Sequence, residues 1–309
     1  MLLEPSVVPE SGAVAELPTI EPASRRWGVD SEYGRLLDVL LSPPPHLEIL
    51  PCNSVAIDAI AQGLACCRDA AASEHDALVK SLEDAGVRCH LVPPIESLPD
   101  LSFTRDSVLM TPWGLLELAP AVAHRSGEAS HVRSIAEAWG IPILGGIAEG
   151  HAEGGDIAIV RPGLVVIGHS GERTDLAGAR SVAGLFNRRG WTSLLYEFDP
   201  HFLHLDTQFA MVDRNLAVAC AEILDGAFLD RIGALGIEIV PVSYGEVMRL
   251  GGNLLSLGDR RILSPRGNDR LNRELARRDY EIIEVELGQF IRCGGGVHCL
   301  TMPLSRLPG

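Results

Sequence analysis

The stretch EGGDIAIVRPGLVVIGHSGERTDLAGARSVAGLFNRRGWTSLLY, residues 153–196, decides the fold that the sequence predicts. It begins with a polar, glycine-rich box, and two short apolar runs then flank the turn RPG, which is the pattern of a β-hairpin. Helical spacing extends from Thr174 to Arg189, and Gly190 leads into the apolar strand WTSLLY. The stretch therefore predicts one unit of hairpin, helix and strand.

The same unit recurs five times along the chain. Hairpins are expected at SVLMT/LLEL, IAIV/LVVIG, QFAMV/LAVAC and LLSL/RILS, and the further helices at 69–85, 126–139, 222–235 and 268–278. The remaining hairpin would be split between GRLLDVLLSP near the start and GGVHCLTMPL near the end. Pairing these two segments would close a ring and leave no open sheet edge. A polar box precedes each unit, marked by Asp106, Asp156, Asp206, Asn253 and Gly296.

If the units surround an axis, these boxes converge on one central pocket. The alternative is an ordinary layered α/β sheet, because alternating strands and helices usually form βαβ units. Under either reading, no linker-like composition follows residue 25, so residues 26–309 are predicted to form one catalytic domain. Residues 1–25, rich in glutamate and proline, are predicted to be a disordered leader.

Composition excludes several classes of function. The 26 Lys+Arg and 41 Asp+Glu give a net charge of −15, which disfavours nucleic acid as a partner and favours a cationic substrate. Lys80 is the single lysine and no glycine loop precedes it, so a P-loop is excluded. Seven scattered cysteines and the lack of a secretory signal or long apolar run predict reduced thiols in a cytoplasmic protein without a membrane span.

The polar boxes contain reactive side chains: Asp106 in FTRD, Glu153 and Asp156 in EGGD, His204 and Asp206 in HLDT, and Cys299 in GGGVHC. A cysteine that follows three glycines lies where the backbone must approach a neighbour closely, and a nearby imidazole can hold it as a thiolate. Each residue alone has an ordinary structural explanation. Their recurrence at equivalent positions of the repeat predicts a common site.

These boxes, together with GERTD, resemble the guanidine-modifying enzymes: arginine deiminases, dimethylargininases, agmatine deiminases and amidinotransferases. The resemblance extends from about Trp27 to Arg306. It implies the pentein fold, a five-bladed α/β propeller of ββαβ repeats around a central pocket. It also implies a small guanidino substrate and no metal or organic cofactor, and it is compatible with a homodimer.

The resemblance further implies a role for each box. Cys299 would attack the guanidinium carbon and His204 would act as acid and base, while Glu153, Asp106 and Asp206 would hold the guanidinium. Arg173 in GERTD would bind a substrate α-carboxylate, and Arg125 would assist; a surface salt bridge is the alternative for both arginines. The implied reaction is hydrolysis through a covalent thiouronium, which gives a ureido product of the citrulline type and ammonia or an amine.

Some features leave the specificity open. The helical insertion usual in arginine deiminases is absent, whereas HLDT is deiminase-like, since dimethylargininases tend to have lysine at the Asp206 position. His298 is similar to the histidine of agmatine deiminases and amidinotransferases. Three alternatives therefore remain: an amidinotransferase, a non-catalytic pentein binding protein, and a metal-binding protein that uses Cys293, His298, Cys299 and His204.

Overall fold

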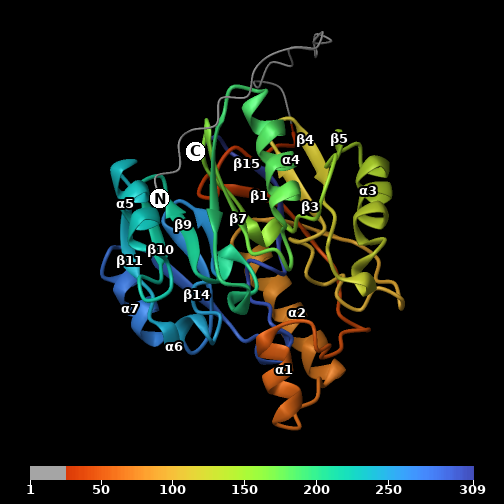
Figure 1. The fold of residues 1–309 in the computed structure, drawn as a ribbon. Coiled ribbons are helices and arrows are strands. Elements are labelled where there is room, and N and C mark those ends of the chain that lie inside the picture. The colour runs from red at the N-terminus through yellow and green to blue at the C-terminus, as the bar shows by residue number, and fades with distance from the viewer. Residues whose placement is uncertain (1–25) are drawn as a thin grey trace.

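The computed structural model describes residues 26–309, and the predicted leader lies outside them. The described chain contains five separate three-stranded sheets, one for each predicted unit, so the alternative of one layered sheet is wrong (Figure 1). The sheets are β15–β1–β2 (Met302–Arg306, Leu36–Leu41, Arg88–Leu91), β3–β4–β5 (Val108–Thr111, Gly114–Glu117, Ile143–Gly146), β6–β7–β8 (Ile157–Arg161, Leu164–His169, Thr192–Glu197), β9–β10–β11 (Phe209–Asp213, Leu216–Ala219, Glu238–Pro241) and β12–β13–β14 (Leu255–Gly258, Arg261–Pro265, Glu281–Val285).

All five sheets have the same construction. The middle strand pairs antiparallel with its hairpin partner and parallel with the strand that follows the helix. In the first sheet β1 pairs with β15, with Val39 opposite Pro303 and Leu40 opposite Met302. The predicted split hairpin is therefore confirmed: the last strand of the chain completes the sheet that the first strand begins.

The repeated helices lie between the middle and last strands of each sheet in sequence: α2 (Arg68–Asp84), α3 (Glu128–Ala138), α4 (Leu176–Asn187), α5 (Gly226–Ala234) and α7 (Asp269–Ala276). Each agrees with its predicted range to within a few residues. Four of these helices end at a glycine with positive φ: Gly86, Gly140, Gly190 and Gly236. Because glycine adopts this left-handed conformation without strain, the chain can turn sharply there and enter the following strand.

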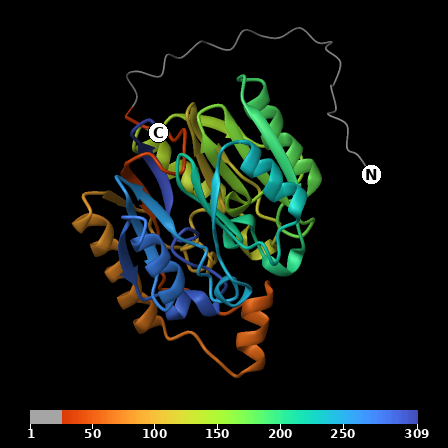
Figure 2. The same ribbon diagram turned by 90° about the vertical axis from the view of Figure 1, so that its left-hand side faces the viewer.

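Three further helices were not anticipated: α1 (Ser54–Ala61), α6 (Tyr244–Val247) and α8 (Gly288–Arg292). Asn53 caps α1 by accepting a hydrogen bond from Ala56 N, and Ser243 and Glu246 form a capping box at α6. Figure 2 shows the orange segment that holds α1 and α2 at the lower edge of the molecule. Within residues 26–309, no helix is long and apolar enough to cross a membrane.

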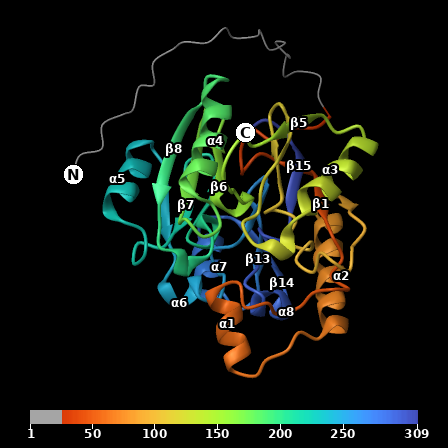
Figure 3. The same cartoon turned by 45° about the vertical axis from the view of Figure 1, so that its right-hand side comes forward.

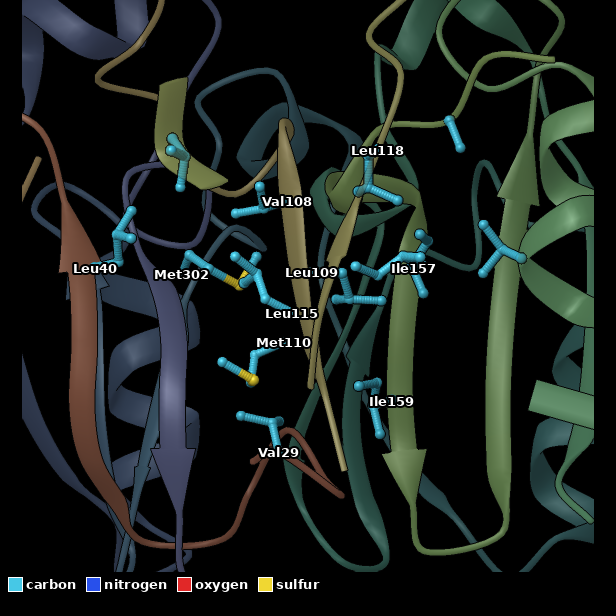
Figure 4. Close-up of a cluster of buried hydrophobic side chains, with 14 of the residues drawn as sticks. Val29, Leu40, Val108, Leu109, Met110, Leu115, Leu118, Ile157, Ile159 and Met302 are labelled. Carbon is cyan, nitrogen blue, oxygen red and sulfur yellow. The ribbon is translucent and has the colours of Figure 1, made fainter. Parts of the chain in front are cut away.

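Figure 3 shows α2, α3 and α5 at the periphery, with strands between them. Strands of neighbouring sheets contact one another: β15 with β3, β6 with β9, β9 with β12, and β12 with β1. Side chains of β3 and β4, including Val108, Met110 and Leu115, fill the space between β15 and β6 (Figure 4). Burial of such aliphatic side chains contributes about 1.5–3 kcal/mol each, so this packing holds neighbouring sheets together.

Candidate active site

The five polar boxes are joined to one another by hydrogen bonds. Each box contacts the next in sequence, and the last contacts the first. The bonds are Gly155 N to Asp106 Oδ1 (3.3 Å), Leu205 N to Asp156 Oδ1 (2.9 Å), Asn253 Nδ2 to Asp206 O (3.5 Å), Cys299 N to Asn253 Oδ1 (3.2 Å) and Arg105 N to Cys299 O (3.2 Å). The structure therefore brings the boxes together in a closed chain of contacts.

Cys299 lies in the turn before β15, where the preceding glycines pack closely against neighbours. A Cβ at Gly296 would lie 2.6 Å from Asn253 Oδ1, and one at Gly295 would overlap the Phe103 ring. The thiol is 2 % exposed, and Asn253 Nδ2 donates to Sγ at 3.2 Å. The glycines thus allow the close approach that the sequence predicted, and they seat the thiol against an amide donor.

The charges around Cys299 disfavour the thiolate in this structure. Burial raises the pKa of Cys299 to about 12, the Asp206 and Asp106 carboxylates add to the rise, and a hydrogen bond with His204 opposes it. A cation bound beside these carboxylates would offset their charge and lower the pKa of the thiol. The site is therefore suited to a thiol that ionises when a cationic ligand arrives.

The imidazole ring of His204 packs directly against the backbone of Gly155. A Cβ at Gly155 would lie 2.8 Å from the His204 ring, so the EGGD box leaves room for the imidazole. His204 Nε2 donates to Glu153 Oε2 at 2.8 Å. Although burial lowers it, the nearby charges of Asp106 and Asp156 raise the pKa of His204 well above its usual value. The imidazole is therefore held as a cation that can donate a proton.

Glu153 is fully buried behind His204 rather than in the wall of the cavity beside Cys299. Its carboxylate also accepts from Arg173 Nη1 at 3.3 Å. Although burial opposes the shift, the His204 hydrogen bond and the Arg173 charge hold the pKa of Glu153 well below its usual range. Glu153 is thus an ionised group that orients the imidazole.

The cavity beside Cys299 contains most of the predicted site residues. Its walls include Asp106, Arg125, Arg173, His204 and Cys299. Four residues that the sequence analysis did not assign to the site also line it: Cys52, Asn53, Asp100 and Phe103. The sequence carried one usable signal for two of them: Phe103 is the first residue of FTRD, and Asp100 lies three residues before it in the same loop.

Arg125 is buried, so a surface salt bridge does not describe it. Its Nε and Nη2 donate to the Glu128 carboxylate at 2.8–3.1 Å, and its Nη1 donates to Asp106 Oδ2 at 2.7 Å. Nη2 also donates to the Phe103 carbonyl at 3.0 Å. All three guanidinium nitrogens of Arg125 therefore donate to groups of the protein, and one of these bonds fixes the position of the Asp106 carboxylate.

Arg173 is 5 % exposed and lines the cavity. One of its terminal nitrogens donates to the Cys52 carbonyl at 2.6 Å and the other to Glu153. It is bound less completely than Arg125, because no carboxylate pairs with it in a bidentate manner. An anionic ligand group in the cavity would find it available.

Asp206 lies beside the Cys299 thiol, in a neighbouring cavity with Glu32 and His298. Its Oδ2 is 3.7 Å from Cys299 Sγ and accepts from His298 Nδ1 at 2.8 Å, while His298 Nε2 donates to Glu32 at 3.0 Å. Asp206 Oδ1 is buried without a hydrogen-bond partner. His298, to which no role was assigned, therefore holds the Asp206 carboxylate against the thiol.

Two groups of side chains within residues 26–309 have the spacing of metal ligands, each with its donor atoms within 4.8 Å of one another. The first group is Asp106, Glu153 and His204. Arg125 Nη1 lies 2.7 Å from Asp106 and 3.7 Å from Glu153, so the positive charge of this arginine already offsets the negative charge of the two carboxylates. The other is Cys52, Asp100 and His124. Neither group matches the metal-binding set that the sequence suggested as an alternative, which was Cys293, His298, Cys299 and His204.

The arrangement combines a buried thiol, an imidazole that can donate a proton, and the carboxylates Asp106, in the cavity wall, and Asp206, beside the thiol. A planar cation can be held by the carboxylates, attacked by the sulfur and supplied with a proton by the imidazole. These parts are what displacement of an amine from a cationic carbon centre requires.

Comparison with known proteins identifies relatives with related chemistry. Residues 56–306 match the family described as N,N-dimethylarginine dimethylhydrolase, eukaryotic. An uncharacterized Bacillus subtilis protein, YkgA, is 29% identical over 282 residues, which cover 89% of this chain and 94% of that protein. The N(G),N(G)-dimethylarginine dimethylaminohydrolase of Pseudomonas aeruginosa is 27% identical over 233 residues, 75% of this chain and 87% of that protein.

A solved structure has the same fold. The N-terminal domain of ArgZ, a cyanobacterial arginine dihydrolase crystallised with substrate, superposes with a TM-score of 0.76 at 18% identity, covering 88% of this chain and 99% of that one. At this identity the likeness concerns the fold alone.

Proposed function

The chain belongs to the N,N-dimethylarginine dimethylhydrolase family, and from this membership and the geometry of its cavity we propose that it hydrolyses the guanidino group of arginine or an arginine derivative. The observation that carries the proposal is the position of Cys299 Sγ, within 3.7 Å of the Asp206 carboxylate in a cavity wall that also contains His204 and Asp106. The thiol, the acid and the Asp106 anchor thus share one cavity, and Asp206 lies beside the thiol from the neighbouring cavity.

Binding is the first step. The guanidinium donates to Asp106 and to the unpartnered Asp206 Oδ1, and its positive charge offsets the carboxylates that raise the pKa of the thiol. The Cys299 proton is then released to solvent, because His204 already carries a proton, and the thiolate accepts a hydrogen bond from Asn253 Nδ2. Arg173 takes the substrate α-carboxylate, whose charge it matches.

Covalent catalysis follows. Cys299 Sγ forms a bond to the central guanidinium carbon, His204 gives its proton to the departing nitrogen, and the carbon–nitrogen bond breaks to leave a thiouronium on the enzyme. His204, now neutral, takes a proton from water, and the resulting hydroxide adds to the same carbon. The carbon–sulfur bond then breaks and releases a ureido product. Glu153 holds the imidazole in place throughout, through its hydrogen bond to Nε2.

Unmodified arginine is the substrate that these contacts favour. Methylation of the terminal nitrogen would remove donors for Asp106 or Asp206, and each buried carboxylate left unpaired costs about 1–3 kcal/mol. The expected preference over dimethylarginine is at least about tenfold. The alternative, dimethylarginine, is favoured by the family description and by the name of the Pseudomonas relative.

A substrate panel tests the proposal. Arginine, methylated arginines and agmatine are each incubated with the wild type, and the ureido product and the released ammonia or amine are measured. Acid quenching and mass spectrometry of the wild type should find the adduct on Cys299, and the Cys299→Ser variant should be folded and inactive. An adduct on Cys293 or Cys220 would refute the assignment. Transfer of the amidino group to added ornithine, glycine or lysine would replace hydrolysis by amidinotransfer.

We also infer that the five sheets are blades around one axis. The closed chain of hydrogen bonds between the boxes and the contacts between strands of neighbouring sheets support this arrangement.

A further inference from the structure

A groove lies between the fourth and fifth sheets, away from the cavity beside Cys299. Its volume is about 360 Å³, within the range of small-molecule sites. Its walls come from the turn between β9 and β10, the start of β11, the turn between β12 and β13, and the segment between α7 and β14. Helix α7 contacts β11 in this region, on the left side of Figure 1. The proposed hydrolysis uses no residue of this groove.

The groove and the catalytic residues lie at opposite ends of the same strands. Strand β9 begins just after the box of Asp206 and ends at Asp213, in the wall of the groove. Strand β12 begins just after the box of Asn253 and ends two residues before Arg260. Strands of four or five residues span about 13–17 Å. The groove is therefore separate from the substrate cavity.

Arg260 is held in the wall of the groove as a cation without a carboxylate partner. Asp259 and Arg260 form the two-residue turn between β12 and β13, with φ of 51° and 59°, the left-handed conformation that a tight hairpin turn requires. The Arg260 guanidinium lies 4.6 Å from the centre of the Tyr280 ring. Its Nε and Nη2 donate to the carbonyls of Asp279 and Arg278. Within residues 26–309, Arg260 makes no ion pair and its Nη1 donates no hydrogen bond.

Two more arginines line the groove. Arg278 donates through Nη1 to Glu238 and through Nε to Glu274, and its Nη2 donates no hydrogen bond to the described residues. Arg214 donates through Nη1 to the Gly309 carbonyl at 3.2 Å, and it makes no ion pair in the part of the chain that the structure describes. The groove therefore gathers three guanidinium groups from three separate segments.

Two carboxylates also line the groove, and both already have partners. Asp213 accepts from the Tyr280 hydroxyl at 2.8 Å and from the amide of Arg214 at 2.7 Å, and Glu238 pairs with Arg278. Three guanidinium groups against two carboxylates leave an excess of one positive charge, on a chain whose net charge is −15. The positive groups repel one another until an anion lies between them. The groove is therefore suited to an anionic ligand.

The shape of the guanidinium group indicates which anion fits. Its N–H groups form a planar fork that matches two oxygens of a phosphoryl group, and several arginines around one anion suit a charge greater than one. We propose that Arg214, Arg260 and Arg278 bind a phosphoryl group, as an inorganic ion or as part of a larger ligand. Arg260 Nη1 and Arg278 Nη2 donate to its oxygens. The bound ligand links the fourth and fifth sheets, so it stabilises the folded protein.

Calorimetric titration of the full chain with pyrophosphate tests the proposal, at low ionic strength and without divalent metal ions. One saturable site per chain is expected, together with a higher Tm in the presence of pyrophosphate. Arg214→Gln and Arg260→Gln should each weaken binding by at least about tenfold. Arg260→Lys keeps the charge but loses the fork, so its affinity should be intermediate. The matched control Arg188→Gln, at an exposed arginine outside the groove, should bind as the wild type does.

A second titration, with ATP, identifies the source of the phosphoryl group. Equal affinities for pyrophosphate and ATP would assign the site to phosphoryl groups alone, and tighter binding of ATP would assign it to a larger ligand; both results uphold the site. The absence of saturable binding, or full affinity in Arg214→Gln and Arg260→Gln, would overturn the proposal. Loss of binding in Arg173→Gln would also overturn it, because the anion would then lie in the catalytic cavity. Turnover is not measured, so failure of the proposed hydrolysis would leave these results unchanged.

Discussion

Replacement of Asp206 by asparagine should make Cys299 more acidic. Asp206 Oδ2 lies 3.7 Å from the sulfur, and its charge contributes to the rise in the pKa of the thiol to about 12. At 3.7 Å and an effective dielectric constant of about 20, two unit charges interact by about 4–5 kcal/mol. This corresponds to at most about three pH units.

The expected shift is smaller than this limit. His298 Nδ1 donates to the same oxygen, and despite its burial the charges of Glu32 and Asp206 raise the pKa of His298. Its positive charge therefore offsets part of the Asp206 charge. We expect Asp206→Asn to lower the pKa of Cys299 by about one to two units, while turnover falls because a guanidinium anchor is lost.

The assay is the rate of iodoacetamide alkylation across a pH series, with the peptide that contains Cys299 quantified by mass spectrometry, since the other cysteines also react. Asp225→Asn is the matched control, because Asp225 caps α5 and asparagine caps a helix equally well. Superposable pH profiles for Asp206→Asn and wild type, in a variant with normal thermal unfolding, would show that this carboxylate does not act on the thiol.

Three further predictions follow from buried contacts. Gly155→Ala places a methyl group against the His204 ring and should lower kcat by at least about tenfold with little change in Tm. Steady-state kinetics and thermal unfolding measure the two quantities, and an unchanged kcat would contradict the packing argument. Arg125→Ala leaves the Asp106 and Glu128 charges unpaired and should lower the free energy of unfolding in urea by about 3–5 kcal/mol. The control Arg133→Ala, at an exposed ion pair, should lower it by less than about 1 kcal/mol. Equal losses in the two variants would argue against the buried network. Although burial opposes it, the Arg105 and His298 charges lower the pKa of Glu32 to about 2, so its stabilising contribution is full above its unfolded pKa of about 4.5 and is lost as pH falls toward 2. Unfolding free energy should therefore fall less steeply between about pH 5 and pH 3 in Glu32→Gln than in wild type, and parallel curves would exclude this role for Glu32.

The repeat made the fold predictable. Each hairpin, helix and strand carries a local signal in the sequence, such as the glycines at 86, 140, 190 and 236 that end four helices with positive φ. Helices α1, α6 and α8 lie outside the repeat and are short, so the periodicity of apolar residues did not predict them. The cap at Asn53 was the one readable sign of α1.

The site was predictable only in part. Equivalent positions in the repeat pointed to Cys299, His204 and the box carboxylates, and the structure gathers them around one thiol. The partners of Arg125 were not predictable, because Glu128 and Asp106 meet it only after the 3-10 helix Ala123–Arg125 and α3 fold back onto the first box. The position of Asp100 and Cys52 in the cavity, and the support that His298 gives Asp206, likewise depend on contacts between distant segments.

The pairing of β1 with β15 sets the order in which the enzyme can be assembled during synthesis. The two strands lie near opposite ends of the described chain, and bringing them together costs about 5 kcal/mol of loop-closure entropy. Cys299 stands three residues before β15, so it is synthesised immediately before the strand that completes the first sheet. A nascent chain that stops short of Cys299 has an unpaired edge at β1 and also lacks the proposed nucleophile. The Cys299 thiol and the strand that completes the first sheet are therefore added at nearly the same point of translation.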